Sequence, residues 1–145
     1  MAKRISAKKL ISVGGGGGAS ARSEVSGTTA SIADTASASL TISGTGKTGQ
    51  LLSIETSAAA WVTVYSSQAA RTADNNRSES TDPAPGSGVI AEVATTDAQT
   101  LLFTPVAGFC NSEDTPVSEL YLKVVNKSGA AAEITVTLTV VSTEV

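Results

Sequence analysis

The residues that could carry out chemistry in this chain are few, and none of them completes a catalytic or phosphate-binding motif. The segment from Gly44 to Gly49 (GTGKTG) ends like a phosphate-binding P-loop, but that motif requires a glycine five positions before Gly46, where the chain has Thr41. The residues that follow alternate like a strand, whereas a P-loop is followed by a helix whose N-terminus faces the phosphate. We therefore interpret the segment as a polar hairpin turn.

Loop carboxylates are the second group of candidates for chemistry. They fall in two polar stretches and comprise Asp74, Glu79, Asp82, Glu113 and Asp114. Clustered carboxylates can hold Ca²⁺, and a pair of them can act as acid and base in glycoside hydrolysis. The chain has no EF-hand spacing and few aromatic rings for stacking against a sugar. We interpret these acids as solvated charges or as ion-pair partners of Arg71 and Arg77.

The chain contains no histidine and one cysteine, Cys110. Without histidine it has no Ser-His-Asp or Cys-His nucleophile and no histidine-ligated zinc site. A single cysteine also excludes a disulfide framework within one chain. Cys110 follows Phe109 and has no neighbouring base, so we expect a buried or half-buried thiol with no nucleophilic role. We expect a protein that is not an enzyme and that uses no cofactor or metal.

The elements that would position these residues read as strands. Seven segments alternate apolar and polar residues or are rich in β-branched residues: 39–43, 50–56, 61–67, 88–96, 100–105, 119–126 and 132–141. No segment shows a helical period of useful length. The pattern predicts an all-β fold, an antiparallel β-sandwich or jelly roll of about seven strands with an extended N-terminal arm.

The clearest strand is the last one. Ile134, Val136, Leu138 and Val140 alternate with threonines, so we expect these four side chains to face the core. We expect them to pack with the alternating apolar residues of the preceding strand, which are Leu120, Leu122 and Val124. Residues 126–129 (NKSG) have turn chemistry and are predicted to join the last two strands as a hairpin.

The charge divides the chain into two parts. Residues 1–22 carry five basic residues and no acid, whereas residues 23–145 carry five basic and thirteen acidic residues. We interpret residues 1–22 as a basic arm and residues 23–145 as the β-sandwich domain. The residues expected to make assembly contacts are Lys3, Arg4, Lys8, Lys9, Leu10 and Ile11. The arm could contact nucleic acid, an acidic protein surface or the body of a neighbouring copy, and the alternative is a solvated tail without a partner. Nucleic acid is the least expected of the three partners.

Five consecutive glycines connect the arm to the domain: Gly14, Gly15, Gly16, Gly17 and Gly18. A glycine run loses the most backbone entropy on ordering and has no side chain to pack, so it is predicted to act as a hinge.

The polar stretch 66–88 is too long for a simple connection between strands. We expect four residues of this stretch to make structural or inter-subunit contacts: Arg71, Asp74, Arg77 and Asp82. Each arginine can bind a carboxylate through two parallel hydrogen bonds. We predict that the loop is ordered, that both arginines pair with its acids, and that at least one arginine is substantially buried.

Residues 61–93, with the later segments 120–129 and 134–140, resemble the small β-sandwich virion proteins of tailed bacteriophages, especially marine and cyanobacterial phages. In those proteins an aromatic strand, an R-x-x-D-x-x-R stretch, a D-P-x-P-G-S-G-V turn and a final hairpin recur together. Here the stretch is Arg71, Asp74 and Arg77, and the turn runs over residues 82–89. The resemblance covers roughly residues 50–143.

The resemblance implies a structural role in the virion without catalysis. The implied partners are other virion proteins, such as capsid, portal, neck or tail subunits, and further copies of the chain itself. No membrane partner is expected. Head decoration, neck or collar, and tail attachment all remain open positions. The alternative function is a receptor- or carbohydrate-binding module on a phage fibre or tail.

Overall fold

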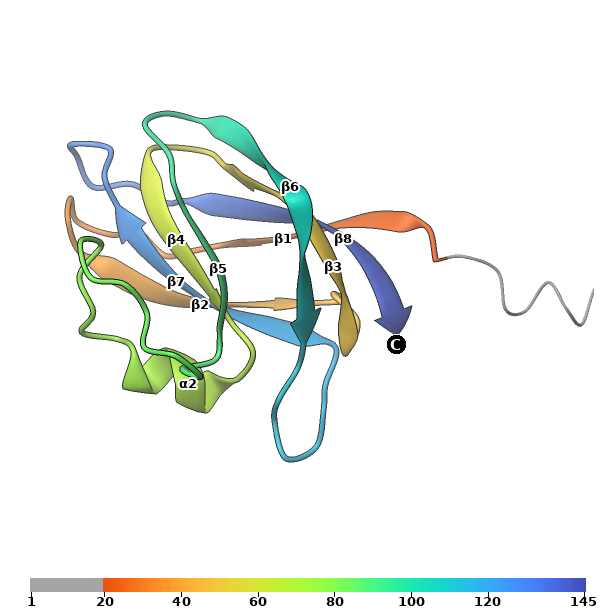
Figure 1. Ribbon diagram of the computed structural model, residues 1–145. Helices are drawn as coiled ribbons and strands as arrows, with labels where there is room; N and C mark the ends of the chain where they lie inside the picture. The colour runs from red at the N-terminus through yellow and green to blue at the C-terminus, as the bar shows by residue number, and fades with distance from the viewer. Residues whose placement is uncertain (1–19) are drawn as a thin grey trace, which may run out of the picture.

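The computed structural model describes residues 20–145, which form an almost entirely β-stranded domain (Figure 1). Its strands are β1 (Arg22–Thr28), β2 (Ser37–Ser43), β3 (Thr48–Thr56), β4 (Ala60–Tyr65), β5 (Val89–Ala94), β6 (Gln99–Cys110), β7 (Glu119–Asn126) and β8 (Thr135–Glu144). Helix α2 (Gln68–Ala73) lies between β4 and β5. The predicted all-β class is confirmed.

The arm and hinge residues named above lie outside the described part of the chain, from Lys3 to Ile11 and from Gly14 to Gly18. Arg22, which the charge pattern assigned to the end of the arm, is the first residue of β1. In the described range, no helix is both long enough and apolar enough to cross a membrane.

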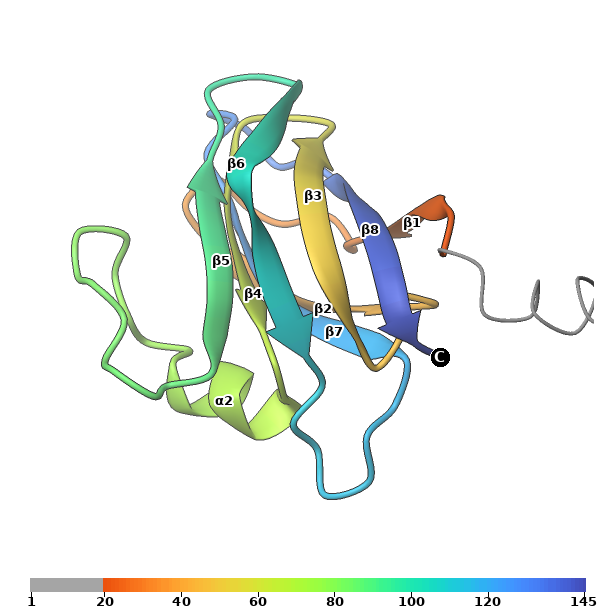
Figure 2. The same cartoon turned by 45° about the vertical axis from the view of Figure 1, so that its right-hand side comes forward.

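The strands form two four-stranded antiparallel sheets, in the orders β1-β8-β3-β6 and β2-β7-β4-β5. The first strand pairs with the last, the second with the seventh, the third with the sixth and the fourth with the fifth. The chain is therefore one long hairpin, rolled so that β8 also meets β3 and β7 also meets β4. This nested pairing is jelly-roll topology, and Figure 2 shows β6, β3 and β8 side by side across the first sheet.

The core lies between the two sheets. The burial of the alternating apolar residues near the last two strands confirms the prediction that these side chains face the core. Ile134, Val136, Leu138 and Val140 are fully buried, as are Leu120, Leu122 and Val124 from the other sheet. Burying a Leu, Ile or Val side chain stabilises a fold by about 1.5–3 kcal/mol. These seven side chains therefore supply much of the driving force for packing one sheet on the other.

The predicted hairpin at residues 126–129 is wrong, because β7 and β8 belong to different sheets. The Asn126 side-chain amide donates to the carbonyl oxygens of Ile32 (2.8 Å) and Ala130 (2.7 Å). These bonds direct the chain across the end of the sandwich instead of back alongside β7. The same turn-forming residue types occur in hairpins within one sheet and in connections that cross between sheets, so the local sequence does not distinguish the two.

The structure has eight strands where the sequence predicts about seven. The missing one is β1, whose sequence RSEVSGT offers little apolar alternation. In this strand only Val25 and Gly27 are half-buried, and the other residues are exposed. Strand β1 is fixed by its pairing along β8, from Arg22 opposite Val141 to Thr28 opposite Thr135.

Candidate functional site

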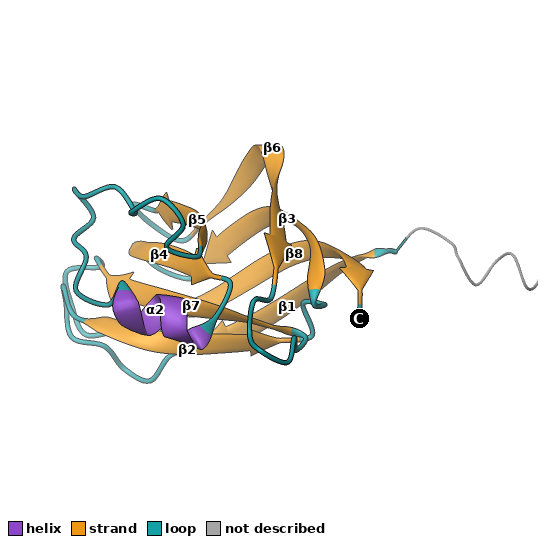
Figure 3. Cartoon of the chain, turned by 60° about the horizontal axis from the view of Figure 1, so that its bottom comes forward, coloured by secondary structure: helices purple, strands orange, loops and turns teal. Residues whose placement is uncertain are grey.

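The stretch 66–88 lies over the outer face of the sheet β2-β7-β4-β5, and Figure 3 shows α2 in front of this sheet. The stretch contains a helical turn that the sequence analysis missed. The Ser67 side chain caps this helix by accepting a hydrogen bond from the amide of Ala70 at 3.1 Å. A six-residue helix is too short to show a hydrophobic period, so this cap was the only local signal of it.

The residues on the outer face of β4 and β7 are buried, although alternation points them away from the core. They are Trp61, Thr63, Tyr65, Tyr121 and Lys123. Burial on both faces makes β4 inaccessible along its whole length. The stretch 66–88 therefore acts as a third layer, and its contacts decide what this face can do.

Arg77 is the central contact of this layer, and its side chain is only 6% exposed. Its Nε atom donates to both carboxylate oxygens of Asp74 at 2.9 Å. Its Nη2 atom donates to Glu92 Oε2 of β5 at 2.8 Å, and Nη1 donates to the Thr81 carbonyl oxygen at 2.8 Å. Burial lowers the pKa of the Arg77 guanidinium, but its hydrogen bonds to Glu92 and Asp74 outweigh that effect, and the pKa is raised. The guanidinium thus fastens the loop to the sheet.

Lys123 is a buried cation beneath the same loop, with only 2% of the residue exposed. Its Nζ atom donates to the carbonyl oxygens of Asp74 (3.1 Å) and Arg77 (3.2 Å) and lies 4.5 Å from the centre of the Trp61 ring. Arg77 lies over the same ring, with its Cζ atom 5.3 Å from the centre. Burial lowers the pKa of Lys123, and the charge of Asp74 opposes that change.

The sequence analysis did not select Lys123, Glu92, Tyr65 or Trp61 as members of this cluster. One feature of the sequence could have indicated the cluster: Lys123 is a charged residue between Leu122 and Val124 in a largely apolar strand. A lysine in that position requires a partner that covers it.

Of the two arginines predicted to pair with acids of this stretch, Arg77 does so and Arg71 does not. Arg77 and Asp74 form a buried ion pair. Arg71 does not bind a carboxylate: its Nη1 atom donates to the Leu40 carbonyl oxygen at 2.9 Å, and its guanidinium lies 5.5 Å from the Tyr121 ring centre. Asp82 is exposed and forms no salt bridge within residues 20–145. The helix points Arg71 at the edge strand β2, which is out of reach of the loop acids.

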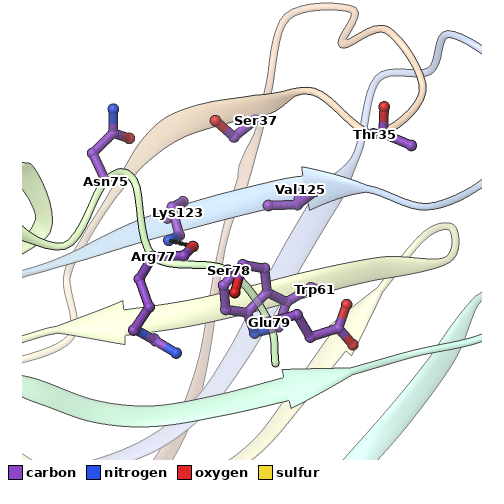
Figure 4. Close-up of a pocket in the computed structure, with 9 residues that line it drawn as sticks. All are labelled: Thr35, Ser37, Trp61, Asn75, Arg77, Ser78, Glu79, Lys123 and Val125. Atoms are coloured by element: carbon purple, nitrogen blue, oxygen red, sulfur yellow. Dashed lines mark hydrogen bonds between the residues drawn. The ribbon is translucent and has the colours of Figure 1, made fainter. Parts of the chain in front are cut away.

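A hollow of about 300 Å³ opens beside this cluster (Figure 4). Its walls come from the loop, β2, β4 and β7, and are Thr35, Ser37, Trp61, Asn75, Arg77, Ser78, Glu79, Lys123 and Val125. The two cations among these residues already donate to protein acceptors, and Trp61 is only 5% exposed. The hollow therefore offers to solvent hydroxyl and amide groups and the Glu79 carboxylate, which pairs with Lys127 at 2.7 Å, with little ring face for a sugar.

The GTGKTG segment joins β2, which ends at Ser43, to β3, which begins at Thr48. The predicted hairpin is wrong, because these two strands belong to different sheets. Gly46 has a φ of +85°, and a Cβ atom there would come within 2.1 Å of the Ser142 hydroxyl oxygen. The Lys47 amide donates to the Glu144 carbonyl oxygen at 2.7 Å. Glycine at position 46 therefore serves close packing against the end of β8, not phosphate binding.

Cys110 is exposed, so the expectation of a buried thiol is wrong. It ends the edge strand β6, where Phe109 faces inward and alternation turns the next side chain outward. Within residues 20–145, no group of three acidic or thiol side chains is arranged to hold a metal ion. Glu113 instead accepts a hydrogen bond from the Gln68 amide at the start of α2.

Among residues 20–145, no segment covers the outer face of the other sheet, β1-β8-β3-β6, in contrast to the first face, and we call it the open face. It carries a hollow of about 530 Å³ whose apolar lining includes Leu52, Leu102 and Val106. Leu102 is 74% exposed and Val106 is 41% exposed. Large apolar side chains that are gathered on an open sheet face are typical of interaction surfaces.

These features define an eight-stranded jelly-roll domain with one outer face covered by its own loop and the other face open. Comparisons with protein-family models, with curated proteins and with solved structures give no match for this chain.

We expect Tyr65→Phe to change the alkaline stability of the domain. The Tyr65 hydroxyl donates to Asp74 Oδ2 at 2.7 Å, and burial together with the Asp74 carboxylate raises the pKa of this phenol well above its usual range. Loss of this bond to a charged group should cost about 1.5–3 kcal/mol at neutral pH.

The sign of the pH effect follows from proton binding. Above about pH 10 the unfolded chain releases the Tyr65 proton while the folded chain keeps it, so the stability due to Tyr65 falls as the pH rises. Lys123 contributes with the opposite sign. Because its pKa is lowered in the folded state, the folded chain loses this proton before the unfolded chain does, and the stability due to Lys123 rises with pH up to the ordinary lysine pKa. Since wild type and variant share Lys123, the difference between their urea unfolding curves should shrink from pH 8 to pH 12. A constant difference would contradict the assignment.

Proposed function

We propose that this protein is a non-enzymatic structural subunit of a tailed-phage virion, which assembles through its basic arm and its β domain. The observation that carries the proposal is the contrast between the two outer faces. One face is covered by a loop whose buried charges are already paired inside the domain. The other face exposes Leu102 and Val106 to solvent.

Three further features support this proposal. Jelly-roll domains build viral capsids, although they also serve as lectins, so the fold alone does not decide between these functions. Residues 61–93 resemble tailed-phage virion proteins. The separation of a basic arm from an acidic body suits a subunit that contacts its neighbours by charge.

The alternative function, a carbohydrate-binding module, would use the hollow beside Trp61. Such modules stack aromatic rings against sugars, and Trp61 has little exposed surface for that purpose. A saturable change in Trp61 fluorescence on titration with glycans would favour this alternative over the structural role. Trp61 is the only tryptophan in the chain, so the signal reports this hollow alone.

The proposed function is tested by mass spectrometry of density-gradient-purified particles from the phage whose genome carries the gene. We expect the chain in the intact particle, in a copy number set by the symmetry of its attachment site. A copy number in the hundreds would indicate the head, and a small multiple of the tail symmetry would indicate the neck or tail. Recovery of the chain only outside the particles would contradict the proposal.

Deletion of residues 1–18 is expected to leave a folded domain that no longer enters the particle. The described jelly roll begins at Arg22, so the deletion removes no strand of it. The variant should keep the wild-type urea midpoint and be lost from purified particles in a complementation experiment. A matched variant in which only Gly14 to Gly18 are shortened should fold equally well and enter less efficiently. Wild-type incorporation of the truncated chain would contradict an assembly role for the arm.

A further inference from the structure

The open face of the sheet β1-β8-β3-β6 has an apolar centre, which the strand register places on the side away from the core. Leu102 pairs with Ser53, Ser53 with Thr139, and Thr139 with Glu24. Paired residues of antiparallel strands point to the same side of the sheet. The next row across the sheet contains the fully buried Ile54 and Leu138, so the row of Leu102 points outward.

Acidic side chains frame this apolar centre. Glu24 on β1 and Glu55 on β3 line the hollow and are exposed, and Arg22 is the one basic residue of its lining, so the lining is negative by one charge. Within residues 20–145, neither carboxylate takes part in a salt bridge. Glu55 accepts one hydrogen bond, from the Thr100 hydroxyl at 3.3 Å. The face therefore suits a ligand that combines apolar side chains with positive charge.

The chain itself contains such a ligand in residues 3–13, with the sequence KRISAKKLISV. This segment has four basic residues and four large apolar ones, Ile5, Leu10, Ile11 and Val13, and no acid. Residues 20–145 carry six basic and thirteen acidic residues, so the segment and the domain have opposite net charge. The chain that leads to the segment departs from Arg22, which itself lines the hollow.

We infer that residues 3–13 of one copy bind the open face of a second copy. The apolar side chains of the segment cover Leu52, Leu102 and Val106, and its lysines and arginine pair with Glu24 and Glu55. The choice of a second copy over the same copy rests on the proposed function as an assembly subunit. Because the segment and the face are different surfaces, the contact is heterologous and joins copies head to tail into a ring or an open row.

The test uses full-length chains and two sets of substitutions. The arm variant carries Lys3→Glu, Arg4→Glu, Lys8→Glu and Lys9→Glu, and keeps the face. The face variant carries Leu102→Lys and Val106→Lys, and keeps the arm. Both face substitutions lie at exposed positions of an edge strand, where lysine is well tolerated and should leave the circular dichroism spectrum unchanged. Val117→Lys, at an exposed position before β7, is the matched control.

Sedimentation velocity at low ionic strength is expected to show oligomers of the wild type and of the control, and monomers of each variant alone. An equimolar mixture of the two variants should form a dimer and nothing larger, because only one arm–face pair is intact. Added salt should weaken the association, since the charged pairs are exposed to screening.

Other outcomes overturn the inference. A mixture that stays monomeric while the wild type oligomerises excludes arm-to-face binding between copies, and a monomeric wild type indicates that the arm binds its own copy or nothing. Continued oligomerisation of the arm variant would show that two faces bind each other directly. If the mixture forms a dimer but the chain is absent from purified particles, only the virion assignment is contradicted. If the chain is present in the particles but the mixture stays monomeric, only this binding mode is contradicted.

Discussion

Replacing Arg77 with alanine is expected to lower the free energy of unfolding by about 3–5 kcal/mol, the usual effect of removing one partner from a buried ion pair. The guanidinium donates four hydrogen bonds: three bind Asp74 and Thr81 within the stretch 66–88, and the fourth joins the stretch to Glu92 of β5. Without it, the largely buried Asp74 carboxylate keeps the Tyr65 hydroxyl but loses its ion-pair partner, and Lys123 is the cation that remains nearby. Urea unfolding followed by Trp61 fluorescence measures this loss.

Arg71→Ala is the matched control for this prediction. It removes the same side chain from the same loop, but Arg71 forms a single strong backbone hydrogen bond and no ion pair. Its effect should be near the typical value for one hydrogen bond to a charged donor, about 1.5–3 kcal/mol or less. Adding Asp74→Ala to Arg77→Ala should cost less than the sum of the two single changes, because the second removes the unpaired charge. Equal losses for Arg71→Ala and Arg77→Ala would contradict a special role for the ion pair.

Leu138→Ala is expected to destabilise the domain by about 2–5 kcal/mol, through lost apolar burial and the cavity left behind. Leu138 is fully buried in the middle of β8 and lies in register with Ile54 of β3 and Val25 of β1. Strand β8 is paired on both sides, so neighbouring backbone has little freedom to move into the space. Thermal or urea unfolding reports the change directly.

Two controls separate burial from the chemistry of the substitution. Leu102→Ala makes the same change on the open face, where the side chain is mostly in solvent, and should alter stability by less than about 1 kcal/mol. Thr137→Ala, next to Leu138 but on the outer side of β8, should have a similarly small effect. If Thr137→Ala were as damaging as Leu138→Ala, the strand would be placed one residue out of register.

The sequence by itself determined the all-β class and the inward faces of the strongest strands. Strict alternation in β7 and β8 identifies Leu120, Leu122 and the buried residues of β8, because a strand has a period of two and one face must avoid water. An ion pair between Arg77 and Asp74, which are three residues apart, is also consistent with the local sequence. Arg71 lies at the same spacing on the other side of Asp74, however, so the sequence favours an ion pair in this stretch without deciding which arginine forms it.

Only the tertiary structure decided which strands are neighbours and which outer face is covered. Asn126 and the residues after it have turn chemistry whether they form a hairpin or a crossing between sheets, and β1 has no strong pattern before β8 aligns it. Trp61 and Lys123 point away from the core and would be exposed if the loop did not cover them. Burial of this kind depends on contacts between residues that are distant in sequence, and alternation within a single strand carries no information about such contacts.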